Sequence, residues 1–109
     1  MQKSYKLYID DILESIKKIE VYINNISFED FKNNSLINDA VVRNLEIIGE
    51  AVKNIPNEIR KNNPSIEWKK IAGLRDVLIH EYSGINFEIL WDVVTNKIPL
   101  LKKEIQKIK

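Results

Sequence analysis

The feature that most constrains the fold of this chain is a series of apolar stripes at helical spacing. In each stripe, large apolar side chains recur every three or four residues, which places them on one face of an α-helix. The first stripe comprises Tyr5, Ile9, Ile12, Ile16, Ile19, Ile23 and Ile26. The second comprises Ile37, Val41, Leu45, Ile48, Val52 and Ile55. A short third stripe comprises Ile71, Leu74 and Leu78, and the last comprises Phe87, Trp91, Val94, Ile98, Leu101, Ile105 and Ile108. The stripes predict four helical segments that bury one face each.

Capping residues and prolines set the expected ends of the first two helices. Ser27 is suited to capping a short helical turn after the first helix. Asn34 or Ser35 is expected to cap the second helix, and Pro56 to end it. Residues 56–64 are polar and rich in asparagine, so a loop with one helical turn is expected there.

The third helix is expected to begin near Ser65 or Trp68 and to end by Ser83 or Gly84. The last helix is expected to open after Asn86. Pro99 cannot donate a backbone hydrogen bond, so a kink or break is expected near Asn96.

These segments predict an all-α fold, because no stretch shows the alternation of apolar and polar residues that is typical of a strand. With 109 residues, the chain is expected to form a single domain over residues 1–109. The predicted architecture is an up-and-down antiparallel bundle of four to five helices. Two stripes are long enough for one of them to serve a homodimer seam instead of the core alone.

Composition excludes several classes of function. The chain has no cysteine and one histidine, so it can build no disulfide framework, thiol nucleophile or zinc site with several histidines. We therefore expect neither a metal nor a cofactor. The 17 basic and 16 acidic residues produce no global field that would attract nucleic acid or an anionic membrane. No signal peptide or membrane span is visible, so a cytoplasmic location is expected.

Residues 73–84 read GLRDVLIHEYSG and gather the groups best suited to chemistry. On a regular helix Asp76 and His80 would lie one turn apart on the same face, where the carboxylate could raise the pKa of the imidazole. Arg75 and His80 would lie about 140° apart around that helix. They converge only if the arginine side chain reaches across or the helix loosens near His80. A converged pair is suited to moving the proton of a ribose 2′-hydroxyl and holding the phosphate without a metal.

The same residues also have structural interpretations. His80 could be a surface or capping residue near a helix end. Arg75 could pair with Asp76 or Glu81, and the ring of Tyr82 could seal the core while its hydroxyl stays in water.

A second polar group lies on the second predicted helix. Arg43, Glu46, Glu50 and Lys53 fall within about 80° of one another, opposite the apolar face of that helix. They are expected to form a solvated face, although a dimer could bury them.

The chain resembles the HEPN superfamily and, within it, the HepT-like toxins of bacterial and archaeal toxin–antitoxin pairs. Residues 75–80 (RDVLIH) match the family's Arg-x4-His motif, and Tyr82 completes its longer Arg-x4-His-x-Tyr form. Three further segments look like signatures of this branch in their usual order. They are residues 42–51 (VRNLEIIGEA), residues 68–74 (WKKIAGL), and residues 90–94 (LWDVV) with Pro99. The resemblance covers nearly the whole chain.

The resemblance implies a helical bundle that homodimerises, so that two copies of the motif form a metal-independent ribonuclease across a shared cleft. Arg75 and His80 would be the catalytic pair, and Asp76 the polar residue that supports the site. The implied partner is MntA, a nucleotidyltransferase antitoxin that silences such toxins by AMPylation of the motif tyrosine, here Tyr82. This is the arrangement of a type VII toxin–antitoxin system, with RNA as substrate and a homodimer or a higher oligomer with the antitoxin.

Two other classes of function stay open at this point. One is a non-catalytic helical adaptor that binds a nucleotidyltransferase partner or a nucleotide through the motif, and the near-neutral charge favours it. The other is a purely structural bundle, in which replacing Arg75, His80 and Tyr82 would change only stability.

Contacts to RNA would have to come from local basic clusters. One comprises Lys69, Lys70 and Arg75, and the other comprises Lys97, Lys102, Lys103, Lys107 and Lys109. Charge runs of this kind are usually solvated faces.

Overall fold

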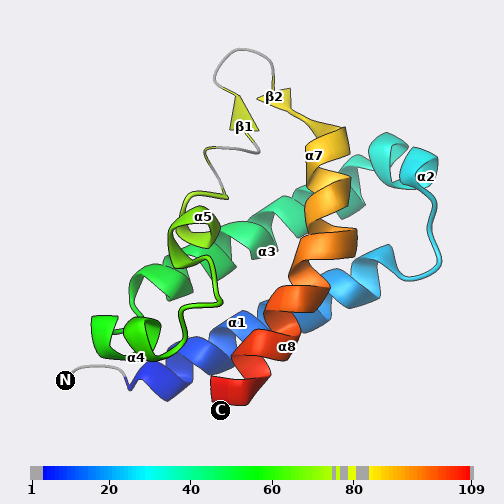
Figure 1. The fold of residues 1–109 in the computed structure, drawn as a ribbon. Helices are drawn as coiled ribbons and strands as arrows, with labels where there is room; N and C mark the ends of the chain where they lie inside the picture. The colour runs from blue at the N-terminus through cyan, green and yellow to red at the C-terminus, as the bar shows by residue number, and fades with distance from the viewer. Residues whose placement is uncertain (1–3, 75, 77–78, 81–83, 109) are drawn as a thin grey trace.

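The first half of the chain forms an antiparallel pair of long helices. The structure, a computed structural model, describes residues 4–74, 76, 79–80 and 84–108, and at residues 79–80 it describes the backbone. Helix α1 spans Tyr5–Ile23, α2 spans Phe28–Asn33 and α3 spans Ser35–Lys53. Figure 1 shows α1 and α3 side by side and oppositely directed, with α2 at the turn that joins them.

The second half adds short elements and one long helical run. Helix α4 spans Asn57–Asn62 and α5 spans Trp68–Ala72. Strands β1 (Ile79–His80) and β2 (Gly84–Ile85) pair antiparallel. Helix α7 (Phe87–Asp92), the π-helical turn η1 (Val93–Lys97) and α8 (Ile98–Ile108) follow end to end and lie across α1 and α3 (Figure 1). The all-α helical bundle is therefore confirmed, with one two-residue ladder added to it.

Side-chain caps start the helices where the sequence places them. The Ser27 hydroxyl accepts a hydrogen bond from the Asp30 amide at 3.1 Å, which confirms the predicted short helix α2. The Asn34 side chain caps α3 in the same way. The Asn86 side chain caps α7, also as predicted. Each cap satisfies an amide that the first helical turn leaves without a partner.

The apolar stripes form a common core. Ile12, Ile16 and Ile19 of α1 are fully buried, as are Val41, Ile48 and Val52 of α3. Leu90 and Ile105 close the core from the C-terminal run. Full burial of one such aliphatic side chain contributes about 1.5–3 kcal/mol, so the stripes account for the main stabilising term.

Helix α2 is held onto this core by the contacts of its two phenylalanine rings with Trp91 and by one buried amide side chain. Phe31 is fully buried and lies 5.0 Å from the ring of Trp91. The buried Asn38 side chain donates hydrogen bonds to the carbonyl oxygens of Phe31 and Lys32 at the end of α2. These contacts join the α1–α3 turn to α7.

The predicted disturbance before Pro99 takes the form of a π-helical turn. The Ile98 amide donates to the Val93 carbonyl, five residues back. A π turn inside a helical run is one of the recognised ways to accommodate a helix interruption. The Thr95 hydroxyl also donates to the Trp91 carbonyl at 2.7 Å. The run therefore continues into α8 and does not break.

The prediction that the third helix extends to Ser83 or Gly84 was wrong. Helix α5 ends at Ala72, and His80 lies in a strand opposite Gly84. Gly84 has φ of +76°, a left-handed conformation that glycine adopts without strain. A short apolar run with β-branched residues does not distinguish helix from strand by periodicity alone.

No helix in the described ranges is both long enough and apolar enough to cross a membrane.

Arg60 of α4 forms hydrogen bonds with the backbone at the C-terminal end of α3. Its guanidinium donates to the Val52 carbonyl at 2.6 Å and to the Ile55 carbonyl at 3.1 Å. It also lies 6.0 Å from the centre of the Trp68 ring. The Val52 carbonyl also accepts a hydrogen bond from the Ile55 amide at 3.1 Å, so Arg60 adds a further hydrogen bond at this end of α3.

We predict that Arg60→Ala lowers the free energy of unfolding by about 1–2 kcal/mol, because two hydrogen bonds to the α3 terminus are lost. The matched control is Lys61→Ala, an exposed residue of the same helix, which should change stability by less than about 0.5 kcal/mol. Urea unfolding followed by circular dichroism measures both. Equal stability of the two variants would show that Arg60 does not fasten α3.

Candidate functional site: the motif segment between two grooves

The predicted site residues are only partly within the described ranges. Arg75 and Tyr82 lie outside them, and His80 is placed by its backbone in β1. Asp76 is described: it is exposed, and its amide donates to the Gly73 carbonyl at 3.0 Å. The proposed roles of all four residues therefore remain predictions.

The expectation that Asp76 and His80 share one helical face was wrong. His80 lies in a strand, so the one-turn spacing gives no reason for the two side chains to meet. The 140° separation of Arg75 and His80, calculated for a straight helix, does not apply either. The chain is extended from Ile79, whereas the alternative considered from the sequence was a helix that loosens near His80.

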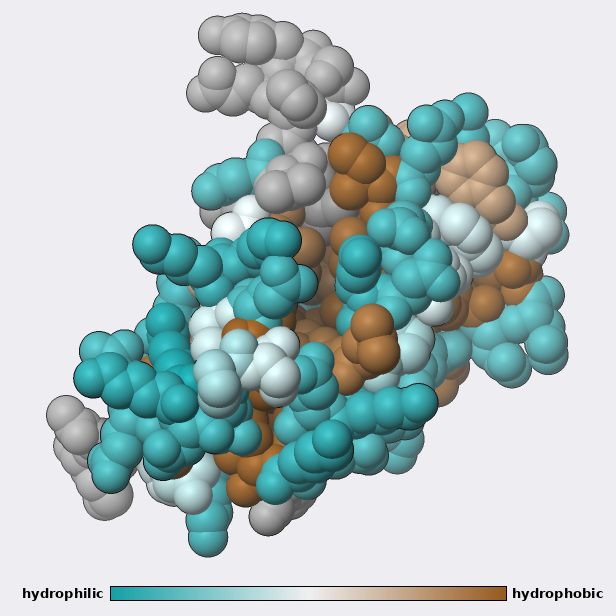
Figure 2. Space-filling model, viewed as in Figure 1, coloured by the Kyte–Doolittle hydropathy of each residue, from teal (hydrophilic) through white to brown (hydrophobic). Residues whose placement is uncertain are grey.

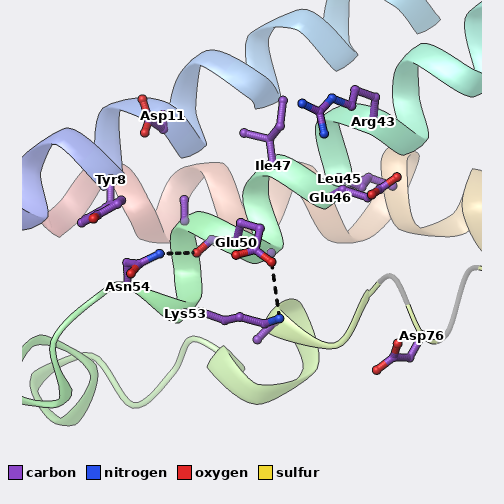
Figure 3. A pocket seen from close by; sticks show the side chains of 13 residues that line it. Tyr8, Asp11, Arg43, Leu45, Glu46, Ile47, Glu50, Lys53, Asn54 and Asp76 are labelled. Atoms are coloured by element: carbon purple, nitrogen blue, oxygen red, sulfur yellow. Dashed lines mark hydrogen bonds and ion pairs between the residues drawn. The ribbon is translucent and has the colours of Figure 1, made fainter.

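One groove lies over the outward face of α3, and we call it the α3 groove. Its volume is about 540 Å³. Arg43, Glu46, Glu50, Lys53 and Asn54 form its floor. Figure 3 shows Tyr8 and Asp11 of α1 on one side of this floor and Asp76 on the other. The predicted solvated face of α3 is thus recessed between two walls.

Carboxylates outnumber cations in the α3 groove. Asp11, Glu46, Glu50 and Asp76 line it, against Arg43 and Lys53. One charge pair is internal, because the Lys53 ammonium lies 3.6 Å from the Glu50 carboxylate. In the described part of the chain, no three His, Asp or Glu side chains gather closely enough to hold a metal ion.

A second groove, the α5–α8 groove, is predominantly apolar. Its volume is about 560 Å³. Apolar side chains line it from both sides, and Figure 2 shows such side chains gathered between the polar surfaces of α5 and α8. The apolar residues are Ile71, Leu74, Val93, Ile98, Leu100 and Leu101. Nothing in the sequence pattern indicated this groove, because its lining comes from α5 and α8, which are distant in sequence.

Charged side chains form the rim of the α5–α8 groove. The Lys70 ammonium lies 2.7 Å from the Glu67 carboxylate. This hydrogen bond and the charge of Lys70 hold the pKa of Glu67 below its ordinary value, and Lys97 acts in the same direction. The same pair raises the pKa of Lys70. Lys69, Lys70 and Lys97, which belong to two separate basic clusters in the sequence, therefore meet around one groove.

The two residues that flank Arg75 in the chain line different grooves. Leu74 lines the α5–α8 groove, and Asp76 lines the α3 groove. Arg75 stands between them in the chain. Each groove therefore has a described residue directly beside the motif arginine in the sequence.

Gly49 of α3 determines how closely this segment approaches the core. A Cβ atom at Gly49 would lie 3.4 Å from the carbonyl oxygens of Ile71 and Ala72, the last residues of α5. This distance leaves room for a methyl group and for nothing larger. The end of α5, the helix that precedes the motif, therefore packs directly against Gly49.

We predict that Gly49→Leu lowers the free energy of unfolding by about 1–3 kcal/mol, since the larger side chain must push α5 away. Gly49→Ala should instead leave stability unchanged or raise it by up to about 1 kcal/mol, because alanine favours the helix. Urea unfolding of the two variants tests this. If the Gly49→Leu protein were as stable as Gly49→Ala, α5 would not pack closely against α3 at Gly49.

The described residues define an all-α helical bundle with one short strand pair beside the predicted motif segment. A sequence model of the family described as "Ribonuclease HepT-like" matches residues 12–108. The chain belongs to this HepT-like family, which confirms the resemblance read from its motifs.

Relatives with full-length similarity carry ribonuclease names. The chain is 45% identical over 109 residues to "Probable ribonuclease HepT" of Thermococcus cleftensis, covering 100% of this chain and 99% of that protein. It is 46% identical over 107 residues to "Putative RNase MJ0127" of Methanocaldococcus jannaschii, covering 98% and 88% of the two chains. It is 44% identical over 106 residues to "Putative RNase TTE0752" of Caldanaerobacter subterraneus subsp. tengcongensis, covering 97% and 95%. No solved structure gives a significant match.

Proposed function

We propose that this protein is a metal-independent endoribonuclease, the toxin of a type VII toxin–antitoxin system. The observation that carries the proposal is the complete Arg-x4-His-x-Tyr motif at residues 75–82, inside the region that matches the HepT-like ribonuclease model. The ribonuclease names of relatives that match over nearly their whole length support it.

The proposed catalytic pair is Arg75 and His80, with Asp76 in a supporting role. The His80 imidazole accepts the proton of a ribose 2′-hydroxyl, and the 2′-oxygen forms a bond to the neighbouring phosphorus. The bond from phosphorus to the 5′-oxygen breaks, and that oxygen leaves with a proton from the solvent or from an imidazolium. The products are a 2′,3′-cyclic phosphate and a 5′-hydroxyl.

Arg75 suits the charge that develops in this reaction. Its planar guanidinium can donate two parallel hydrogen bonds to the phosphate oxygens as negative charge builds up on them. Neither residue needs a metal ion for its role. Because each chain has one histidine, assembly of two chains would place two imidazoles in one cleft, and we propose that the homodimer is the active form.

We predict that the purified protein cleaves RNA in the presence of EDTA and that His80→Ala lowers the cleavage rate by about 100-fold or more, because a positioned acid–base group is lost. Lys61→Ala, which changes an exposed side chain on α4, is the control and should cleave at the wild-type rate. Gel analysis of a labelled RNA measures the rates, and circular dichroism checks that the variants fold.

Cleavage by His80→Ala at the wild-type rate would refute the catalytic assignment. A wild-type protein that is inert towards cellular RNA but binds a nucleotidyltransferase stably would favour the adaptor function instead.

The second part of the proposal concerns silencing by an MntA-like nucleotidyltransferase. The phenolic oxygen of Tyr82 attacks the α-phosphorus of ATP, pyrophosphate leaves, and the phenolic proton passes to the solvent. The resulting AMP group adds bulk and negative charge two residues from His80. An RNA phosphate would then be repelled from the motif.

We predict that incubation with the nucleotidyltransferase and ATP increases the intact mass by AMP units and abolishes RNA cleavage. Tyr82→Phe lacks the acceptor oxygen, so it should gain no AMP and should continue to cleave RNA. Mass spectrometry and the cleavage assay measure the two effects on the same samples. AMP addition to Tyr82→Phe at the wild-type level would place the modification elsewhere.

A further inference from the structure

The floor of the α3 groove carries a hydrogen-bond acceptor and a donor side by side. The Glu50 carboxylate and the Lys53 ammonium lie 3.6 Å apart, and their side chains are 73% and 57% exposed. Figure 3 shows both groups in the groove, joined by a dashed line. An ion pair as exposed as this one contributes little to stability, so a ligand can interact with either partner at small cost.

The groove has the size and the aromatic wall of a site for a flat organic ligand. Its volume of about 540 Å³ is within the range of small-molecule sites. Tyr8 of α1 lines one side and is partly buried against the core. Aromatic side chains are the surfaces on which the bases of single-stranded RNA stack. The groove therefore offers groups that can recognise a base both by its edge and by its face.

The charge of the groove selects against the RNA backbone as its occupant. Four carboxylates line it against two cations, so the phosphates of RNA are repelled. Ionised carboxylates accept hydrogen bonds and donate none. A ligand suited to this floor is therefore one that carries no phosphate there and presents N–H donors. An RNA base meets both conditions, because it is uncharged and carries N–H groups on its edge.

Guanine is the RNA base that matches the Glu50–Lys53 pair most fully. Its edge presents the O6 acceptor followed by the N1–H and N2–H donors. These two donors form a fork like that of a guanidinium, which one carboxylate accepts with both of its oxygens. Uracil places a single N–H between two carbonyl oxygens, so the second carboxylate oxygen would face an acceptor. Cytosine and adenine offer this carboxylate only one amino group.

We propose that the α3 groove binds a guanine base of the RNA substrate. The Glu50 carboxylate accepts hydrogen bonds from N1–H and N2–H, and the Lys53 ammonium donates one to O6. Tyr8 provides the wall on which the base stacks.

This inference deepens the proposed function and rests on it for its meaning. Asp76 lines the groove and directly follows Arg75 in the chain, the residue proposed to hold the phosphate. A base bound in the groove would then belong to a nucleotide beside the cleaved bond. The α3 groove would direct cleavage to phosphates that neighbour a guanosine.

The test measures binding, so it does not require cleavage. Three 2′-O-methyl oligouridines carry guanine, hypoxanthine or uracil at one central position, and fluorescence anisotropy gives their dissociation constants with the full-length protein. The guanine oligonucleotide should bind about tenfold more tightly than the uracil one, because a two-donor contact to a base discriminates by about this factor. Hypoxanthine keeps N1–H and lacks the N2 amino group, so it should fall between them.

Glu50→Ala should bring the affinities for the guanine and uracil oligonucleotides to within about twofold of each other. The change also removes a negative charge, which by itself strengthens the attraction for phosphates. A selective loss of affinity for guanine therefore cannot come from net charge. Glu58→Ala, at an exposed position of α4 outside the groove lining, is the matched control and should keep the wild-type preference. Circular dichroism checks that both variants fold.

Equal affinity of the wild type for the three oligonucleotides overturns the proposal, as does a guanine preference that survives in Glu50→Ala. A Glu50→Ala protein that binds all three more tightly to the same degree also overturns it, because the carboxylate then only repels phosphates. The RNA cleavage assay distinguishes the two proposals. Protein that cleaves RNA but binds without base preference removes only the guanine site, and protein that binds guanine selectively but cleaves nothing removes only the ribonuclease.

Discussion

The packing of the isoleucine stripe of α1 against one face of α3 is the contact on which the rest of the structure depends. It directs the opposite face of α3 outward, where Arg43, Glu46 and Glu50 become the floor of a groove. It also presents Gly49 to the end of α5. Helix α5 ends at Ala72, three residues before Arg75, so this contact positions the described backbone that precedes the motif.

Local features of the sequence predicted most of the fold. The isoleucine stripe and the caps at Ser27, Asn34 and Asn86 act over three or four residues, so they could be read without knowing the tertiary structure. The third helix was predicted too long because Gly84, in a left-handed conformation, and the pairing of β1 with β2 override a short apolar period. The resemblance to the HepT-like family, which depends on motif order and not on periodicity, was confirmed by the family match.

The two grooves could not be predicted, because each is formed by elements distant in sequence. The α3 groove needs α1 and Asp76 to lie on either side of α3, and the α5–α8 groove is lined both by Lys69 of α5 and by Lys97 of η1. The α3 groove is lined mainly by acidic side chains, and the α5–α8 groove mainly by apolar ones. Leu74 lines one groove and Asp76 lines the other, so the residues on either side of Arg75 in the chain belong to different grooves. In the proposed mechanism one imidazole and one guanidinium serve the proton and the phosphate, so a chain with one histidine and no cysteine has the groups that the mechanism requires.

The most direct test of the proposed chemistry is analysis of the ends that the wild-type protein leaves on a defined RNA in EDTA. Transfer through the 2′-hydroxyl predicts 2′,3′-cyclic phosphate and 5′-hydroxyl ends, and a single 2′-deoxy substitution at the cleaved nucleotide should block the reaction. Ends that carry a 5′-phosphate, or cleavage at the deoxy position, would contradict this account.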